Sequence, residues 1–310
     1  MSTVTDERIK ESVRGTYGQI ARRFVEEQPA QAGCCGPEQP QTQQQSGCCG
    51  PSEAEAEAAV AAARFYSDEE IGDLPESVTE ASLGCGNPLA IAGLQPGEVV
   101  LDLGSGGGID CFLAARQVGP EGRVIGLDMT PDMIRLARRN AKKIGATNVD
   151  FRYGEMEEMP LADASVDVII SNCVINLSPD KDTVFGEAYR VLKPGGRLSI
   201  SDIVVDGDLP SSIRNRLDAW AGCIAGALDE SVYLDKIRAA GFERVEVASR
   251  QTTGVDEVTD WDEVQVILAG DDGQAVDGDQ AKAMLQEAGL SPHELAGKVA
   301  SIKVTAYKPA

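Results

Sequence analysis

The sequence is poor in the side chain on which much hydrolytic and metal-dependent chemistry relies. It has one histidine among 310 residues, His293, which lies in a late polar stretch. That count excludes most serine-hydrolase triads, histidine–zinc sites and mechanisms with a histidine base. We interpret His293 as a surface residue and expect the chemistry of this chain to proceed without it.

Long apolar runs are also missing, and acidic residues far outnumber basic ones. No stretch has the length of a membrane span, and MSTVTDERIKESVRG lacks the apolar run of a signal sequence. The net charge of -22 disfavours nucleic acid and anionic membranes as partners. The missing signal and membrane span predict a cytoplasmic protein. We also expect it to be a monomer. The densest basic group has the spacing of a solvent-exposed helix face: Arg135, Arg138, Arg139, Lys142 and Lys143.

Changes in composition divide the chain into three predicted parts. Residues 1–66 hold a helix at 5–25, where apolar groups recur at helical spacing, and then a flexible arm rich in Gln, Pro, Gly and Cys. Residues 67–253 form the predicted core domain. Residues 254–310 form a small appended element whose final strand, VASIKVTAYKP, is expected to return antiparallel to the core sheet.

Strand and helix patterns alternate from about residue 97 onward. Such alternation predicts an α/β fold with a doubly wound parallel sheet and right-handed crossovers. The expected strands are 98–103, 123–128, 149–153, 166–171, 197–202 and 243–249, and the expected helices are 109–118, 131–144, 182–192, 211–227 and 230–240.

A glycine-rich turn joins the first strand to the first core helix in VLDLGSGGGID, residues 100–110. Glycines let the backbone approach a ligand closely, and the helix N-terminus favours negative groups. Asp128 ends the next strand, where a carboxylate can accept hydrogen bonds from ribose hydroxyls. Nicotinamide-binding proteins use a similar turn, but their third glycine is replaced here by Ile109 or Cys111, depending on the register.

The turn instead resembles the first motif of class I methyltransferases, and residues 153–171 and 192–198 resemble later motifs of that family. The resemblance implies a Rossmann-like sheet and S-adenosyl-L-methionine as the cofactor. It also implies contacts to the methionine part, the ribose and the adenine, and it places the predicted cofactor site at Asp102, Gly104, Ser105, Gly106, Asp128, Met129, Glu155, Met156 and Asn172.

Methyl transfer needs a nucleophile, and the sequence offers thiols in unusual surroundings. Cys173 follows the fourth strand at the sheet edge where ligands of doubly wound proteins bind. Cys85 precedes an expected helix start with Asn87 as N-cap, a setting that favours thiolate. Cys223 lies among small residues in AGCIAGA. Each of these cysteines, taken alone, is also compatible with a small buried hydrophobe, which is how we interpret Cys111.

Three converging thiolates suit a soft, three-coordinate centre such as trivalent arsenic, whose lone pair is itself the nucleophile. LGCGNP, SNCVINLSPDK and GCIAGA resemble the arsenite methyltransferase family over roughly residues 80–245. The resemblance implies that Cys85, Cys173 and Cys223 bind As(III), that arsenite and methylarsenite are methylated for detoxification, and that thioredoxin or glutathione restores the reduced state.

The family also has an N-terminal cysteine that takes part in disulfide exchange or metal delivery. This chain offers two vicinal pairs, Cys34–Cys35 and Cys48–Cys49, and we select Cys48 and Cys49 as catalytic because they lie nearer the core. The alternative is a disordered tail whose cysteines do little.

Two rival functions stay open from the sequence. A methyltransferase acting on carbon or oxygen of a small molecule would share the whole cofactor half. A metalloid-binding sensor or sequestering protein would use the repeated GCCGP as its working part. A structural zinc site has less support, because CxxC spacing is absent.

Overall fold

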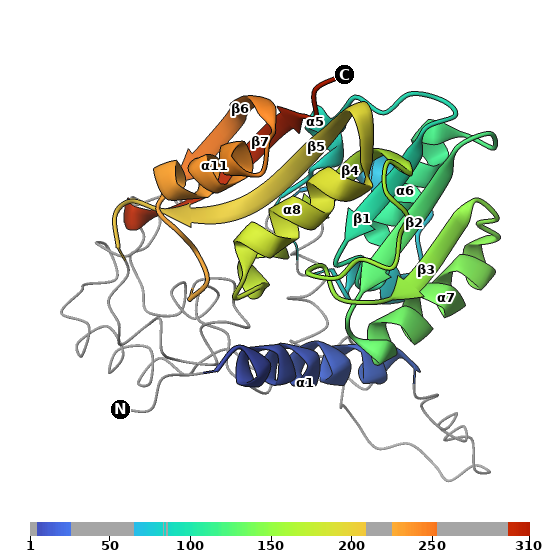
Figure 1. Ribbon diagram of the computed structural model, residues 1–310. Helices are drawn as coiled ribbons and strands as arrows, with labels where there is room; N and C mark the ends of the chain where they lie inside the picture. The colour runs from blue at the N-terminus through green and yellow to red at the C-terminus, as the bar shows by residue number, and fades with distance from the viewer. Residues whose placement is uncertain (1–4, 26–64, 83, 85, 209–224, 253–296) are drawn as a thin grey trace, which may run out of the picture.

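A seven-stranded sheet forms the centre of the computed structural model, in the order β3-β2-β1-β4-β5-β7-β6 (Figure 1). The structure describes residues 5–25, 65–82, 84, 86–208, 225–252 and 297–310. The strands are β1 Val99–Leu103, β2 Arg123–Asp128, β3 Val149–Tyr153, β4 Val166–Asn172, β5 Leu192–Val205, β6 Glu243–Thr252 and β7 Val299–Tyr307.

The direction of the strands fixes where a ligand can bind. Strands β1 to β5 pair in parallel, whereas β7 lies between β5 and β6 and runs antiparallel to both. The expected doubly wound sheet and its antiparallel last strand are thus confirmed. Strand order reverses between β1 and β4, and the carboxyl ends of strands at such a switch point form the usual ligand crevice.

Helices cover both faces of the sheet, and the alternation along each strand explains why. In β1, Val100 packs with Phe112 of α6 and Ile134 of α7, whereas the neighbouring Leu101 packs in the cluster of Phe185 in α8 and Tyr233 in α11. The helical segments are α1 Asp6–Val25, α3 Asp68–Ile71, α4 Glu76–Thr79, α5 Leu89–Ala92, α6 Ile109–Val118, α7 Pro131–Ile144, η1 Ile175–Leu177, α8 Lys181–Val191 and α11 Glu230–Ala239.

Helix α1 lies across the carboxyl edge of the sheet and packs on α7 and η1 (Figure 1). Its buried side chains include Ile9, Val13 and Ile20. Ionic and hydrogen bonds hold both ends of α1. Near its start, Nζ of Lys10 lies 2.6 Å from Oε2 of Glu155. In its last turn, the backbone carbonyls accept from Nη1 of Arg139 in α7. The N-terminal helix therefore covers the carboxyl edge of the sheet.

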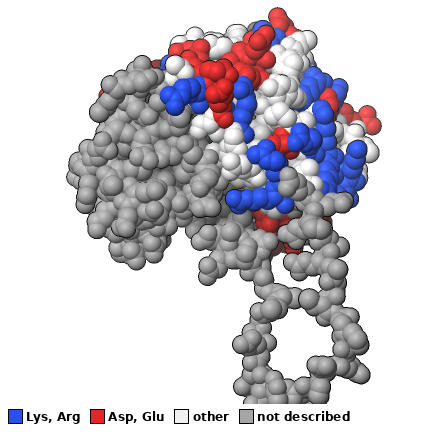
Figure 2. Space-filling model, turned by 90° about the horizontal axis from the view of Figure 1, so that it is seen from below, with Lys and Arg blue, Asp and Glu red and all other residues white. Residues whose placement is uncertain are grey.

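The predicted basic group on α7 is only partly a solvated face. Arg135, Lys142 and Lys143 are exposed, as expected. Arg138 and Arg139, however, donate to backbone carbonyls of β3 and of α1. Seen from below, this side of the molecule carries Lys and Arg side chains gathered to the right and acidic ones at the top (Figure 2). Part of the basic surface thus holds α1 in place.

Most predicted boundaries agree with the structure within a residue or two. Two strands are longer than predicted. Strand β6 ends at Thr252 and not at residue 249, and β5 covers 192–205 and not 197–202. The earlier start of β5 arises because LKPGG pairs with neighbouring segments: Leu192 pairs with Val166, and the carbonyl of Gly196 accepts from Lys308 N. No described helix is long and apolar enough to cross a membrane. Residues 26–64 of the arm, residues 209–224 and most of the appended element lie outside the described residues. Of the helix predicted at 211–227, only residues 225–227 are described, and they are not helical.

Candidate active site

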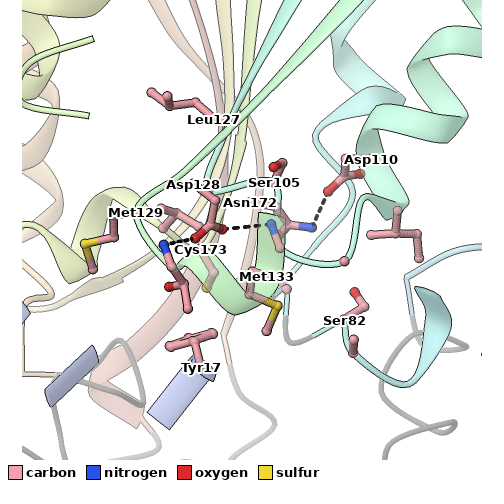
Figure 3. A pocket seen from close by; sticks show the side chains of 18 of the residues that line it. Tyr17, Ser82, Ser105, Asp110, Leu127, Asp128, Met129, Met133, Asn172 and Cys173 are labelled. Carbon is pink, nitrogen blue, oxygen red and sulfur yellow. Dashed lines mark hydrogen bonds between the residues drawn. The ribbon is translucent and has the colours of Figure 1, made fainter. Parts of the chain in front are cut away.

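A crevice opens at the carboxyl ends of β1, β2 and β4, where the strand order predicts one (Figure 3). The glycine-rich turn forms one wall, the segment after β4 forms another, and Val13 and Tyr17 of α1 cover it. Seven predicted site residues line this crevice, namely Gly104, Ser105, Gly106, Asp128, Met129, Met156 and Asn172, together with the predicted arsenic ligand Cys173.

Asp128 is tied to the glycine turn by its backbone partners. Gly106 N donates to Oδ2 at 2.9 Å and Thr130 N donates to Oδ1 at 2.8 Å. Burial raises the pKa of this carboxyl, and those backbone donors oppose the rise. Each carboxylate oxygen keeps a second lone pair, so Asp128 can still accept a hydrogen bond from a ribose hydroxyl.

Two other predicted cofactor residues do not line the crevice. Asp102 is buried behind the turn, where Cys111 Sγ donates to Oδ2 at 3.2 Å; burial, and then Asp110, raises the pKa of Asp102 well above its usual value. Glu155 instead bonds Lys10 and Arg14 of α1, and the hydrogen bond from Lys10 lowers the pKa of this carboxyl. The adenine role of Glu155 stays a prediction, and in this structure its carboxylate holds α1.

A polar network beside the turn was missed by the sequence prediction. Asp110, in the first turn of α6, lines the crevice and is 4% exposed. Its Oδ1 accepts from the hydroxyl of Tyr66 at 2.7 Å, and its Oδ2 accepts from Nδ2 of Asn172 at 3.2 Å. Burial raises the pKa of Asp110 to about 6. Only the position of Asp110 after the turn signals this role, since Tyr66 lies far away in the sequence.

Some buried polar atoms of the crevice lack a protein partner. Ser105 Oγ and Asn172 Oδ1 are buried without a hydrogen-bond partner. Native proteins rarely leave such atoms unsatisfied, and exceptions often mark a ligand site. Together with the carboxylate of Asp128, they suit a cofactor that carries both hydroxyl and amino-acid groups. The residues present therefore fit S-adenosyl-L-methionine.

Cys173 lies directly after β4, on the crevice wall and beneath α1. It is 5% exposed, packs with Ile9 and Val13, and is one half of a disulfide bond. Its backbone has φ of 61°, a conformation that non-glycine residues adopt rarely and that clusters at functional sites. Its N–H donates to the carbonyl of Ser201 at 2.7 Å. The sulfur atom of Cys173 is therefore held next to the glycine turn.

The two glycines that flank Cys85 pack against the residues beside Cys173. A Cβ atom on Gly84 would lie 2.3 Å from Nδ2 of Asn172, and a Cβ on Gly86 would lie 1.9 Å from Oγ of Ser201. In addition, Asn172 donates to the carbonyl of Gly86 at 2.7 Å. Gly84 and Gly86 thus lie against the last residue of β4 and against Ser201 of the neighbouring strand β5.

The other predicted catalytic cysteines lie outside the described residues, namely Cys48, Cys49, Cys85 and Cys223. Asn87 was predicted as an N-cap, but the one-turn helix α5 begins at Leu89 and Pro88 holds the N-cap position. The side chain of Asn87 still bonds this helix, since its Oδ1 accepts from Ala90 N at 3.1 Å. Within the described part of the chain, no three His, Cys, Asp or Glu side chains are grouped to hold a metal ion. Cys111 is free and buried, as expected.

Comparison with known proteins first defines the class. The methyltransferase domain family matches residues 94–289, and the doubly wound sheet with its glycine-turn crevice is the fold of an S-adenosylmethionine-dependent methyltransferase. The arsenite methyltransferase of Halobacterium salinarum is 48% identical over 208 residues, which make up 67% of this chain and 53% of that protein. The human arsenite methyltransferase is 34% identical over 237 residues, covering 74% of this chain and 56% of the human one.

A solved structure narrows the class further. The crystal structure of an arsenic(III) S-adenosylmethionine methyltransferase from Chlamydomonas reinhardtii matches with a TM-score of 0.60 at 33% identity, covering 84% of this chain and 75% of that one. This chain belongs to the arsenite methyltransferase family. It spans about half the length of the curated relatives it matches.

Proposed function

We propose that this protein transfers methyl groups from S-adenosyl-L-methionine to trivalent arsenic held by Cys85, Cys173 and Cys223. The observation that carries the proposal is the packing of Gly84 and Gly86 on Asn172 and Ser201. These contacts hold the two neighbours of Cys85 beside the residues that flank Cys173, which supports the proposal that both cysteines bind one arsenic atom.

Some residues of the crevice would bind the cofactor and others the arsenic substrate. Ser105, Asp128 and Asn172 would hold the amino-acid and ribose parts of the cofactor, with Met129 and Met156 against the adenine. When bound, the cofactor supplies an electrophilic methyl group on a sulfonium. The thiolates position arsenic so that its lone pair faces that methyl group, and orientation of this kind accounts for much of the rate of group transfer.

No protein base is needed for this chemistry, which agrees with the scarcity of histidine. Arsenic donates its lone pair to form the As–C bond and is formally oxidised by two electrons. Two thiols return those electrons and become a disulfide, so a thiol reductant such as thioredoxin or glutathione is required. Because Cys173 is disulfide-bonded, its sulfur must be reduced before it binds arsenic. Cys48 and Cys49 are proposed to relay this exchange.

Helix α1 is proposed to exclude water from the crevice. Val13 and Tyr17 line the crevice on the side of α1, and Lys10 and Arg14 anchor the helix to Glu155. A dry site protects the arsenic–thiolate bonds and strengthens electrostatic interactions within it. A role in arsenic detoxification, a cytoplasmic location and a monomeric state are part of the same proposal.

Arsenic speciation after turnover tests the function directly. Full-length protein is incubated with arsenite, S-adenosyl-L-methionine and excess thiol, and methylated arsenicals are separated and quantified. We expect methylated products from the wild type, at least about a hundredfold less from Cys173→Ser, and wild-type amounts from Cys111→Ser. The matched control is apt because Cys111 is buried behind the turn and the serine hydroxyl can still donate to Asp102.

Two outcomes would contradict the proposal. If no methylated arsenic formed under reducing conditions, arsenic would not be the substrate. If Cys173→Ser retained full turnover, the sulfur at the end of β4 would not bind it, and a small organic acceptor would become the better candidate.

A further inference from the structure

Asp110 is a buried carboxylate that faces the crevice without a cationic partner. It is 4% exposed, and its hydrogen-bond donors, Tyr66 and Asn172, are both neutral. Within the described part of the chain, Asp110 forms no ion pair, and the crevice lining includes neither Lys nor Arg. Buried carboxylates are normally paired, so this one is suited to a cationic ligand.

The amide of Asn172 contributes a second acceptor beside Asp110. Its Nδ2 lies within hydrogen-bonding distance of the Tyr66 hydroxyl, the Gly86 carbonyl and Asp110 Oδ2, at 3.0, 2.7 and 3.2 Å. Two of these groups only accept, which fixes the amide orientation and leaves Oδ1 as an acceptor. That Oδ1 is buried and has no partner. A carboxylate and an amide oxygen therefore lie side by side on one wall.

The position of this pair selects a particular part of the cofactor. Asp110 and Asp128 lie on opposite sides of Ser105 and Asn172, so the ribose end and the Asp110 end of the crevice are distinct (Figure 3). An ammonium group has three donors and no acceptor, and it matches a wall of acceptors. The unpartnered hydroxyl of Ser105 suits the neighbouring carboxylate of the amino acid.

We infer that Asp110, oriented by Tyr66 and assisted by Asn172 Oδ1, binds the α-ammonium group of the methionine moiety of S-adenosyl-L-methionine. Asp110 is then a residue that selects cofactors carrying an intact amino acid, and Tyr66 is a positioning residue. The inference rests on the cofactor of the proposed function and does not depend on its arsenic substrate.

Calorimetric binding with two ligands tests the inference without turnover. One ligand is S-adenosylhomocysteine, and the other is its analogue in which hydrogen replaces the amino group. Full-length wild type should bind S-adenosylhomocysteine at least about tenfold more tightly, as expected for a charge-assisted hydrogen bond. Asp110→Asn should bind both ligands within about twofold of each other. Tyr66→Phe should show an intermediate preference.

A control variant separates this effect from general damage to the crevice. Asp128→Asn should weaken both ligands alike and keep the wild-type preference, because Asp128 lies at the ribose end. The inference is overturned if the wild type does not distinguish the two ligands, a result that needs no variant to fold. It is also overturned if Asp110→Asn keeps the full preference for the amino group. Loss of arsenic methylation with these binding results intact would contradict only the proposed arsenic substrate.

Discussion

Substitution of Gly86 by Ala should disturb the packing of this neighbour of Cys85 against Ser201 of β5. The added Cβ would lie 1.9 Å from Oγ and 3.0 Å from Cβ of Ser201, far inside van der Waals contact. Gly86 is not among the glycines with positive φ, so we expect the effect to come mainly from this steric clash. Overpacking of this kind costs roughly 1–3 kcal/mol.

A double-mutant cycle locates the clash. Ser201→Ala removes the atom at 1.9 Å and leaves a tight contact at 3.0 Å, which a shift of a few tenths of an ångström relieves. The double variant Gly86→Ala/Ser201→Ala should therefore recover most of the loss, with a coupling energy of about 1–2 kcal/mol. Free energies of unfolding from urea titrations give the cycle, and arsenite binding by the reduced protein shows whether the segment has moved.

A glycine elsewhere provides the matched control. Gly15 lies within α1, and a Cβ added there would have no neighbouring atom within 4 Å. Gly15→Ala should be neutral or stabilise by up to about 1 kcal/mol, because alanine favours the helix. If Gly86→Ala were as harmless as Gly15→Ala, or if Ser201→Ala gave no recovery, the contact between the Cys85 segment and β5 would be refuted.

Three further predictions concern helix α1, the buried acid Asp202 and the glycine-rich turn. Glu155→Gln should weaken its bond to Lys10, lower the docking free energy of α1 by about 1 kcal/mol and speed hydrogen exchange along α1; equal exchange in both proteins would contradict this. Burial raises the pKa of Asp202 to about 6, so the protonated acid favours folding below about pH 4 and that advantage is lost as the pH rises through 6. Asp202→Asn should therefore gain on the order of 2–3 kcal/mol relative to wild type between pH 4 and 7 in urea titrations, and parallel curves would refute it. Gly104 has φ of 68°, and a Cβ added there would lie 2.4 Å from Val174. Gly104→Ala should therefore lower the free energy of unfolding by at least about 2 kcal/mol and abolish S-adenosylhomocysteine binding. Unchanged binding in calorimetry would contradict this prediction.

Periodicity predicted much of this fold because local signals agree with the tertiary structure. The helix expected at 109–118 has those bounds in α6, where Gly108 and Gly119 flank it in conformations with positive φ. The strand at 149–153 and the helix at 131–144 also agree. The start of β5 was placed too late, since LKPGG has turn-forming residues and only its pairing with β4 and the C-terminal residues extends the strand.

The candidate site was predictable where one motif carries it and not where distant segments meet. The glycine-rich turn at 104–106 follows β1, and Asp128 ends β2, so each is recognisable from a strand-end motif in the sequence. Both line one crevice. By contrast, the bond between Tyr66 and Asp110 joins residues 44 apart, and no local pattern marks it. The engagement of Glu155 by α1 was likewise unpredictable, because it depends on how a remote helix docks.

Arsenic X-ray absorption on the reduced protein with one equivalent of arsenite tests the central claim most directly. We predict that only sulfur atoms surround arsenic in the wild type and in Cys111→Ser. Cys173→Ser should lose one sulfur neighbour and gain an oxygen neighbour. An oxygen-bound arsenic in the wild type, or an unchanged sulfur count in Cys173→Ser, would contradict the claim that the thiolate at the end of β4 holds the substrate.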